Sequence, residues 1–363
     1  MLHLIKRIEK LQQNLNENEA YLIISELHNY YLTGFASTDG ALIIDKKGAY
    51  LLVDSRYAEA AYLSVKHCRV ICFSKLFESI SDVLKSDNAN TVYLERENIT
   101  VKTSDMLKTK LASAGFKPVS NDRLDNELFD LRLCKDETEK QYMQEAQDIT
   151  EKAMNKTLTK LYPGMTEREF ALELEYEMKK LGAKEVSFDL ITISAEKTSM
   201  PHGEPDDSPI KNNSLFTMDI GATYKGYHSD MTRTVAIGEI TNQMKDIYNI
   251  VLKAQLAALE LVKPGVRCSD IDKAARDIIE KEGYGEFFRH STGHGVGIEI
   301  HEHPAVAPSG DVVLKPGMVI TVEPGIYLPG KFGVRIEDMV LVTENGYHNF
   351  ANAPKGLITY SLS

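Results

Sequence analysis

The sequence has no long apolar run and no signal-like start. A membrane-spanning helix needs roughly 18 consecutive apolar residues. No segment of this 363-residue chain approaches that length of apolar sequence. The first twenty residues mix polar and apolar side chains, whereas a secretory signal needs a continuous apolar core. We therefore expect no membrane partner and a cytoplasmic location.

Cysteine is also scarce. The chain has four, none of them in a C-x-x-C pair: Cys68, Cys72, Cys134 and Cys268. Four cysteines in a chain of this length do not make a disulfide framework, so we expect reduced thiols in a cytosolic protein. Cys68 and Cys72 could together bind a metal, although buried strand positions are the more common reason for such a pair.

An excess of basic residues is missing as well. The formal net charge is −11, which argues against nucleic acid as the main partner because phosphate binding requires a basic face. An acidic balance suits a chain that gathers carboxylates around cations. The length predicts about two domains, and the hydrophobic fraction of 43% is sufficient for sizeable cores.

The first third of the chain alternates short strands and helices, which predicts an α/β domain. Residues 75–85 have the apolar spacing of a helix, and residues 45–48 form a turn between two strands, which predicts a hairpin. The expected strands are residues 41–44, 49–53, 70–73 and 91–94. The character changes near residue 131. We therefore predict two domains, residues 1–131 and residues 132–363.

The second domain contains a degenerate repeat. After Asp136 and Glu139, a plausible capping pair, a long helix is expected to about Lys160. A Pro-Gly pair then precedes a helix that closes at a glycine, and the same arrangement returns about 100 residues later. Its two copies run from Gly164 to Gly182, with Thr166 opening the helix, and from Gly265 to Gly283, with Ser269 opening it. The repeat predicts two similar α+β halves, with a natural binding cleft between them.

Two aspartates flank a predicted hairpin in the first half. Asp219 ends the apolar stretch 215–218, and Asp230 opens the stretch 231–236. Neighbouring strands would bring the two carboxylates to about 5 Å, where they repel each other unless they share a proton or a cation. Ordinary turn aspartates are the alternative interpretation of this segment taken alone.

Histidines gather in the second half. His290, His294, His301 and His303 are four of the ten histidines of the chain. Neutral imidazole is the commonest metal ligand and carries protons near pH 7, and the glycines beside His294 allow the backbone to approach a ligand closely. The cluster therefore indicates a site.

Two further segments supply acidic groups. Glu323 ends an apolar strand before a Pro-Gly stop, and alternation places Arg335 and Glu337 on one face of a strand spanning residues 333–342. A structural Arg–Glu ion pair is the alternative for the latter. Together the four segments offer oxygen ligands and one imidazole, which favours two divalent cations that share carboxylates, such as Mn²⁺, over a Cys/His zinc site.

In order and spacing, these segments resemble the pita-bread metallopeptidases, the superfamily of methionine aminopeptidase, prolidase and aminopeptidase P. The resemblance covers essentially the whole chain. Residues 29–35 and 53–57 resemble the creatinase/prolidase-type N-terminal domain. The fold class that the resemblance implies is α+β, with a pita-bread catalytic domain of two pseudo-symmetric halves after a smaller α/β domain.

The resemblance also implies roles for individual residues. Two metal ions, Mn²⁺ foremost and Co²⁺ or Zn²⁺ as alternatives, would be bound by Asp219, Asp230, His294, Glu323 and Glu337. Glu323 would also be the general base. His301 would hydrogen-bond the substrate carbonyl or shuttle protons, and Arg335 would orient the glutamates. His290 and His202, the latter in Met200-Pro201-His202, would complete the substrate cleft.

The resemblance implies a peptidase that cleaves the bond between an N-terminal residue and proline, like aminopeptidase P; the alternative is an Xaa-Pro dipeptidase, or prolidase. Proline-containing peptides would be its partners, and a homodimer is expected. Creatinase-like enzymes and non-catalytic relatives lack the intact ligand set, which is present here. One departure is the segment Ser194–Ser199, which is more charged than the resemblance leads us to expect.

Overall fold

The chain divides into two compact units, of which the first comprises Met1–Arg132 and the second begins at Leu133. The structure is a computed structural model that describes residues 1–362. Among these residues, no helix combines the length and apolar character needed to cross a bilayer. The two units are described in turn.

The first unit is built on a six-stranded sheet with the order β4-β3-β2-β1-β5-β6. Its strands are β1 (Glu19–Ile23), β2 (Ala41–Asp45), β3 (Ala49–Val53), β4 (Arg69–Cys72), β5 (Thr91–Leu94) and β6 (Lys117–Val119). The expected hairpin is β2–β3, whose strands pair antiparallel from Ala41↔Leu52 to Ile44↔Ala49. The four strands expected from the sequence all form, and their ends differ from the expectation by one residue at most.

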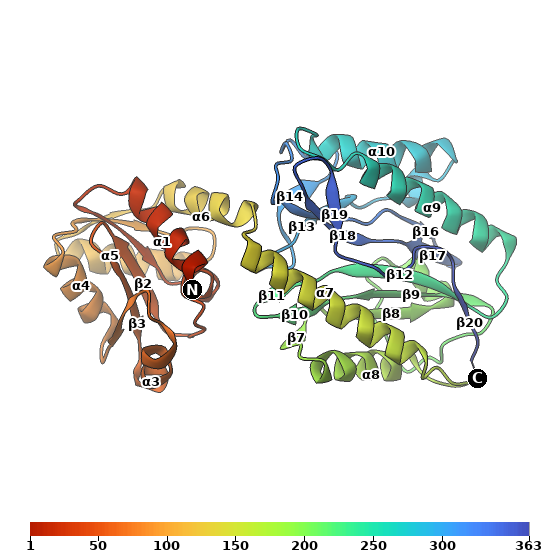
Figure 1. The fold of residues 1–363 in the computed structure, drawn as a ribbon, viewed down its shortest axis with the longest axis horizontal. Helices are drawn as coiled ribbons and strands as arrows, with labels where there is room; N and C mark the ends of the chain where they lie inside the picture. Colours follow the sequence, from red (N-terminus) through yellow and green to blue (C-terminus); the bar gives the residue numbers. More distant parts are fainter. Residues whose placement is uncertain (363) are drawn as a thin grey trace. The chain divides into compact units, whose positions relative to one another are not determined.

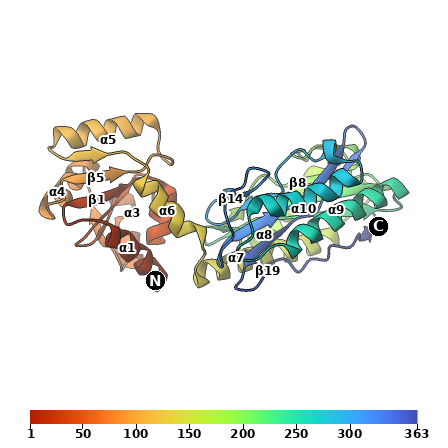
Figure 2. The ribbon, with the colours of Figure 1, turned by 90° about the horizontal axis from the view of Figure 1, so that it is seen from above.

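Helices cover both faces of this sheet. They are α1 (Leu2–Asn14), α2 (Glu26–Thr33), α3 (Ser55–Ser64), α4 (Leu76–Ser86), α5 (Val101–Ser113) and α6 (Arg123–Leu133). Figure 2 shows α1 and α5 on opposite sides of the sheet. Leu84 of α4 and Leu111 of α5 are fully buried against strand residues such as Leu22, so one core lies beneath this pair of helices.

The second unit consists of two similar halves. The first half contains α7 (Glu137–Leu158), α8 (Glu167–Lys180) and a four-stranded sheet; the second contains α9 (Asn242–Glu260), α10 (Cys268–Lys281) and a five-stranded sheet. Figure 1 shows α7 and α8 beside β8 and β9, and α9 and α10 beside the strands of the second half.

The first sheet has the order β20-β12-β9-β8 and the second the order β14-β13-β15-β18-β19. Their strands are β8 (Ile191–Ser194), β9 (Ser214–Ile220), β12 (Met231–Ile237), β20 (Thr359–Tyr360), β13 (Gly293–Gly295), β14 (Glu302–Val306), β15 (Val319–Val322), β18 (Asp338–Val342) and β19 (Tyr347–Asn349). Smaller sheets are formed by β7 (Glu185–Val186), β10 (Ala222–Tyr224) and β11 (Tyr227–His228), and by β16 (Gly325–Leu328) and β17 (Phe332–Arg335).

The repeat expected from the sequence is present in the structure. Gly164 and Gly265 have φ angles of +91° and +88°, and both helices that follow are tied back to a later segment by an isolated antiparallel bridge. These bridges join Thr166 to Pro209 and Arg267 to Val313. Because the same turn and the same tie occur twice, the two halves share one supersecondary design.

The starts of the helices agree with the sequence in two cases and differ in one. Asp136 with Glu139 and Thr166 with Glu169 form complete capping boxes. The prediction that Ser269 opens the second repeat helix was wrong, because α10 begins at Cys268 and its cap, Arg267, makes no side-chain cap hydrogen bond. The backbone tie from Cys268 N to Val312 O occupies this helix start instead.

Candidate metal centre

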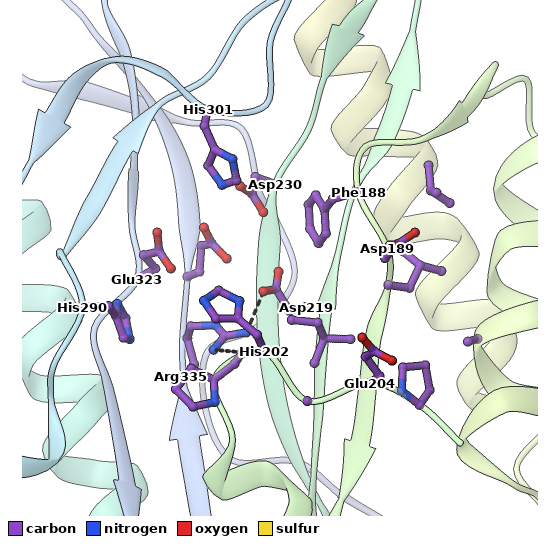
Figure 3. A pocket seen from close by; sticks show the side chains of 18 of the residues that line it. Phe188, Asp189, His202, Glu204, Asp219, Asp230, His290, His301, Glu323 and Arg335 are labelled. Carbon is purple, nitrogen blue, oxygen red and sulfur yellow. Dashed lines mark hydrogen bonds and ion pairs between the residues drawn. The ribbon is translucent and has the colours of Figure 1, made fainter. Parts of the chain in front are cut away.

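The five predicted ligands lie on strands or strand ends that meet at one cavity. Asp219 is the penultimate residue of β9, Asp230 precedes β12, and His294 is in β13. Glu323 directly follows β15 and Glu337 directly precedes β18. All five line a cavity of about 840 Å³, within the size range of ligand-binding sites. Figure 3 shows Asp219 and Asp230 on one side and Glu323 and His290 on the other.

Asp219 and Asp230 are held by the pairing of neighbouring strands, as the sequence predicted, although the two strands are not joined by a single turn. Strands β9 and β12 are antiparallel, with Asp219 opposite Thr232. The chain between them forms a second small hairpin, β10–β11. The register brings Asp219 and Asp230 to neighbouring positions at the end of the β9–β12 pair, which is where the cavity opens.

The ligand atoms are close enough to share a cation. One atom each of Asp230, His294 and Glu337 lies within 4.8 Å of the others. His294 Nε2 is 3.5 Å from Asp230 Oδ2 and also 3.5 Å from Glu323 Oε1. These separations are those of groups that surround one centre.

The electrostatics of these groups fit divalent ions. Burial, followed by the charges of neighbouring carboxylates, raises the pKa of Asp230 and that of Glu337 well above their ordinary values. Burial likewise raises the pKa of Glu323 to about 8. Asp219 Oδ1 is buried without a hydrogen-bond partner among the described residues. Crowded carboxylates with an unsatisfied oxygen are stabilised by cations, so the residues present fit the metal ions that the ligand set implies.

His294 is prepared for metal binding. Burial lowers its pKa to about 4, so the imidazole is neutral at pH 7. Its Nδ1 lies 3.0 Å from the carbonyl oxygen of Gly295, which can only accept a hydrogen bond. Nδ1 therefore carries the hydrogen, and the lone pair of Nε2 faces Asp230 and Glu323.

Two glycines explain how His294 comes so close to the neighbouring strand. A Cβ atom on Gly293 would lie 2.0 Å from the carbonyl oxygen of Thr321 in β15, and one on Gly295 would lie 2.2 Å from that of His303. Any side chain at either position would push the strands apart. The glycines beside His294 thus serve close strand packing, whereas the sequence had suggested that they let the backbone approach a ligand.

Arg335 and Thr232 connect the carboxylates. Arg335 donates from Nη2 to Asp219 Oδ2 at 2.6 Å and from Nε to Thr232 Oγ1 at 3.0 Å. Thr232 Oγ1 in turn donates to Glu337 Oε2 at 2.7 Å. Arg335 therefore orients two of the candidate ligands, one directly and one through Thr232. Sequence reasoning did not identify Thr232, because a threonine within a strand carries no signal of this kind.

The prediction that Arg335 and Glu337 share one strand was wrong. Strand β17 ends at Arg335, Ile336 and Glu337 form a break, and β18 begins at Asp338. The two strands also belong to different sheets, since β17 pairs with β16 and β18 with β15. The break allows Glu337 to turn toward Thr232 while Arg335 reaches Asp219.

His290 joins the same network through Tyr327. Arg335 Nη1 donates to Tyr327 Oη at 2.7 Å, and Tyr327 Oη lies 2.9 Å from His290 Nε2. His290 Nδ1 is 2.8 Å from the carbonyl oxygen of Ser291 and so carries the hydrogen. Burial lowers the pKa of His290 to about 4. Tyr327 therefore donates to a neutral histidine at the cavity wall.

The two remaining histidines also line the cavity. The ring of His301 stands edge-on to that of His294, with 4.5 Å between the ring centroids. His202 belongs to the segment after β8, and Arg335 Nη1 donates to the carbonyl oxygen of the preceding Pro201 at 3.2 Å. In the view of Figure 3, His202 overlaps Arg335, whose hydrogen bond to Asp219 is dashed, and His301 is drawn near Asp230. The structure thus brings every predicted site residue to this one cavity.

Five carboxylate and imidazole groups with a hydrogen-bonded arginine, set in a cleft between two similar halves, define a metal-dependent hydrolase. The chain belongs to the family described as Metallopeptidase family M24, which matches residues 141–344. The Creatinase/Prolidase N-terminal domain matches residues 7–127. The chain is therefore a metallopeptidase, and the α+β pita-bread fold with its N-terminal domain is confirmed.

Named relatives resemble the chain over nearly its full length. An Xaa-Pro dipeptidase of Pyrococcus furiosus is 38% identical over 97% of this chain and 99% of its own. The solved structure of an Xaa-Pro dipeptidase from Bacillus anthracis is 38% identical, with a TM-score of 0.91 over 98% of this chain and 100% of its own. That of an X-Pro aminopeptidase from Thermotoga maritima is 34% identical, with a TM-score of 0.91 and the same coverage.

Proposed function

We propose that this metallopeptidase is an Xaa-Pro dipeptidase, which hydrolyses the bond between a residue and a following proline. The observation that carries the proposal is the convergence of Asp219, Asp230, His294, Glu323 and Glu337 on one cavity that also contains three histidines. From the sequence, an aminopeptidase P-like activity was the first expectation. The names of the relatives favour the dipeptidase, which was then the alternative.

The five residues are proposed to hold two divalent metal ions. Oxygen donors with one imidazole suit Mn²⁺, and Co²⁺ and Zn²⁺ are alternatives. When bound, such ions polarise a carbonyl group and make water a stronger nucleophile near neutral pH. The convergence of carboxylates with raised pKa values supports this assignment.

The remaining side chains are proposed to position the peptide and move protons. Glu323 is the general base that takes the proton of the attacking water and returns it to the leaving proline nitrogen. His301 and His202 donate hydrogen bonds to the scissile carbonyl as negative charge develops on its oxygen. Neutral His290, held by Tyr327, lines the cleft. Arg335 keeps Asp219 in place.

Selectivity for proline is the first test of the proposal. A proline nitrogen has no hydrogen and its ring fixes φ near −65°, so a site suited to this bond needs a ring-shaped pocket and a proton donor for the departing nitrogen. We expect kcat/KM to be at least about 100-fold higher for Leu-Pro than for Leu-Ala with Mn²⁺ present. Such a ratio corresponds to about 2.7 kcal/mol of differential transition-state binding. Similar values for the two peptides would contradict the proposal.

Substrate length separates the two candidate activities. An aminopeptidase is the second candidate, because the Thermotoga maritima structure is as similar in fold as the Bacillus anthracis structure. Leu-Pro and Leu-Pro-Pro are the matched substrates. A dipeptidase cleaves the first and leaves the second intact, whereas efficient cleavage of Leu-Pro-Pro at its first bond would assign the chain to the aminopeptidases.

The domain bounds, the oligomeric state and the cellular location expected from the sequence are also proposed. Residues 1–131 form the creatinase/prolidase-type domain and residues 132–363 the catalytic domain. The chain is a homodimer, which light scattering on the purified protein tests. Its location is cytoplasmic, in keeping with four unpaired cysteine thiols, and cell fractionation tests it.

A further inference from the structure

The segment Pro201–Pro205 forms part of the cavity wall and carries His202. The segment belongs to no helix or strand. A wall of this kind keeps a side chain in place only if other groups hold it, because an irregular backbone has few hydrogen bonds of its own. The groups that hold this segment therefore determine where His202 lies.

The main anchor is an ion pair at the start of α8. Glu167 is fully buried. Its Oε1 accepts hydrogen bonds from Ser194 N at 2.7 Å and from Ser194 Oγ at 3.1 Å, and its Oε2 accepts one from Lys197 Nζ at 2.6 Å. A buried carboxylate with three donors is fixed in position. Glu167 thereby fixes the chain that leads into the segment.

The far end of the segment is tied to the same place. Lys197 Nζ lies 3.0 Å from Asp206 Oδ2, directly beyond the segment. Arg168 N donates to the carbonyl oxygen of Asp206 at 3.0 Å, and Glu167 N donates to that of Ser208 at 3.1 Å. Lys197 therefore contacts both the anchor that precedes His202 and the residue that closes the segment.

The backbone between these points is held in a conformation that it would not adopt alone. Ala195 is buried and has a φ of +54°, in the left-handed region that disfavours residues with a Cβ atom. Thr198 Oγ1 donates to Ala195 O at 2.6 Å and accepts from Gly333 N at 2.8 Å. Such backbone strain persists only where surrounding contacts enforce it.

The charged character of Ser194–Ser199, unexpected from the sequence, divides into two roles. Glu196 pairs with Lys211 at 2.7 Å, and both side chains are more than half exposed. Lys197 pairs with buried Glu167. Exposed ion pairs contribute little, whereas a pair with a buried partner fixes geometry. The first pair therefore provides a matched control for the second.

We propose that Lys197 is a positioning residue for the reaction: its ion pairs with Glu167 and Asp206 hold the segment Pro201–Pro205 so that His202 faces the candidate metal ligands. The inference rests on the proposed function, since it assigns a reason for the placement of His202 in that same site. The proposal depends only on the contacts of Lys197 with Glu167 and Asp206 and involves no bound ligand.

The test removes the charge of Lys197 and keeps its apolar stem. With Leu-Pro as substrate and Mn²⁺ present, Lys197→Met is expected to lower kcat about tenfold and to leave KM within about twofold, because small misplacements of a reacting group reduce the rate strongly. Lys197→Arg should retain most of the activity, and Lys211→Ala should match the unmodified chain. Equal values for Lys197→Met and Lys211→Ala would overturn the proposal. Lys197→Gln is measured in parallel, so that a folding defect of one variant does not decide the result.

A double-mutant cycle tests whether Lys197 acts through His202. In a His202→Ala background, Lys197→Met should reduce kcat by less than about twofold further, because the two changes affect one contact. A full tenfold further loss would overturn the proposed route.

Hydrogen exchange provides a measurement that does not depend on activity. Backbone amides of His202, Gly203, Glu204 and Asp206 should exchange faster in Lys197→Met than in Lys211→Ala or the unmodified chain, and equal exchange would overturn the anchoring role. If the unmodified chain cleaves no Xaa-Pro peptide, the proposed dipeptidase function fails, and the exchange comparison still decides whether Lys197 holds the segment.

Discussion

Glu337 shows how a single side chain serves two requirements at the candidate metal centre. It is 1% exposed, and burial together with the charge of Asp230 raises its pKa. Its Oε2 nevertheless accepts a hydrogen bond from Thr232 Oγ1. An anion in this place destabilises the metal-free protein and binds cations strongly, so its removal should affect stability and metal content in opposite directions.

We therefore predict that Glu337→Gln reduces the bound metal from the proposed two ions per chain to one or none and lowers kcat by at least about 100-fold. The metal-free variant should be at least as stable to heat as the metal-free parent, because the neutral amide removes a repulsive charge. Elemental analysis and thermal unfolding in chelator measure the two effects. The exposed Glu344→Gln is the control, and a full metal complement in Glu337→Gln would refute the assignment.

His301 differs from the candidate ligands in being exposed to solvent. Its ring contacts that of His294 at a centroid distance of 4.5 Å, but the residue is exposed to solvent. A group that supports developing charge on the substrate is needed for the rate and not for metal binding.

His301→Ala should accordingly lower kcat about 100- to 1000-fold and leave the metal content at that of the parent. His303→Ala is the matched control, because His303 is an exposed neighbour on β14 and is absent from the cavity wall. The measurements are steady-state kinetics and elemental analysis on the same samples. Parallel loss of metal and activity would make His301 a ligand.

The candidate ligands could be found from the sequence because they belong to local patterns: Asp219 and Glu323 end apolar runs, and His294 lies among glycines and other histidines. Each of these patterns can be recognised within about ten residues of chain. The roles of these residues as ligands were implied by the family resemblance. The sequence could not indicate Thr232 or the ion pair formed by Glu167 and Lys197. These contacts join residues on different elements, and a single threonine, lysine or glutamate has no pattern that indicates its partner.

At the scale of elements, strands and helices in the first unit followed their sequence signals, since β3 and β5 have the predicted bounds. The break in the strand at Ile336–Glu337 was not indicated by the sequence. An alternating pattern predicts one continuous strand there, but the pairing of β17 with β16 and of β18 with β15 divides it. Which partner a strand chooses depends on residues distant in sequence, so a local pattern cannot reveal the division.

The turn of the β2–β3 hairpin contains a carboxylate that should make stability depend on pH. Asp45 Oδ1 accepts from Lys47 N at 2.8 Å and Gly48 N at 2.9 Å, while its Oδ2 is buried without a partner among the described residues. Burial, assisted by the nearby charge of Asp87, raises the pKa of Asp45 to about 6. The folded state therefore holds this proton more tightly than the unfolded chain does.

The contribution of Asp45 to stability is thus present below about pH 4 and is lost as the pH rises through about 6. Asp45→Asn keeps the acceptor of the turn and offers an N–H group to Asp87. We expect it to match the parent at pH 4 and to be more stable by about 1 kcal/mol at pH 8. Urea unfolding across this range measures the difference. Asp39→Asn, at an exposed position, should show no such trend, and a less stable Asp45→Asn at pH 8 would refute the prediction.

At the scale of the whole molecule, the two units have separate cores. Residues such as Leu22 and Leu52 form a core in the first unit. The second unit has one core in each half, and Phe216 and Ile320 are fully buried members of these two. All five candidate ligands belong to the second unit. The repeat explains this arrangement, because a site between two halves takes ligands from both.

Metal binding should therefore stabilise one unit selectively. An ion that binds only the folded state adds about 2.7 kcal/mol at a concentration 100 times its Kd, which corresponds to roughly 100-fold slower exchange of amides that open with the site. We predict this slowing with Mn²⁺, relative to chelator, in β9, β12, β13, β15 and β18. Amides of β1, β2 and β3 should exchange at the same rate in both conditions, because no candidate ligand lies in their unit. Mass spectrometry after hydrogen exchange measures both sets at once. Equal slowing in the two sets would show that the ions act on the whole molecule and would contradict a site confined to the second unit.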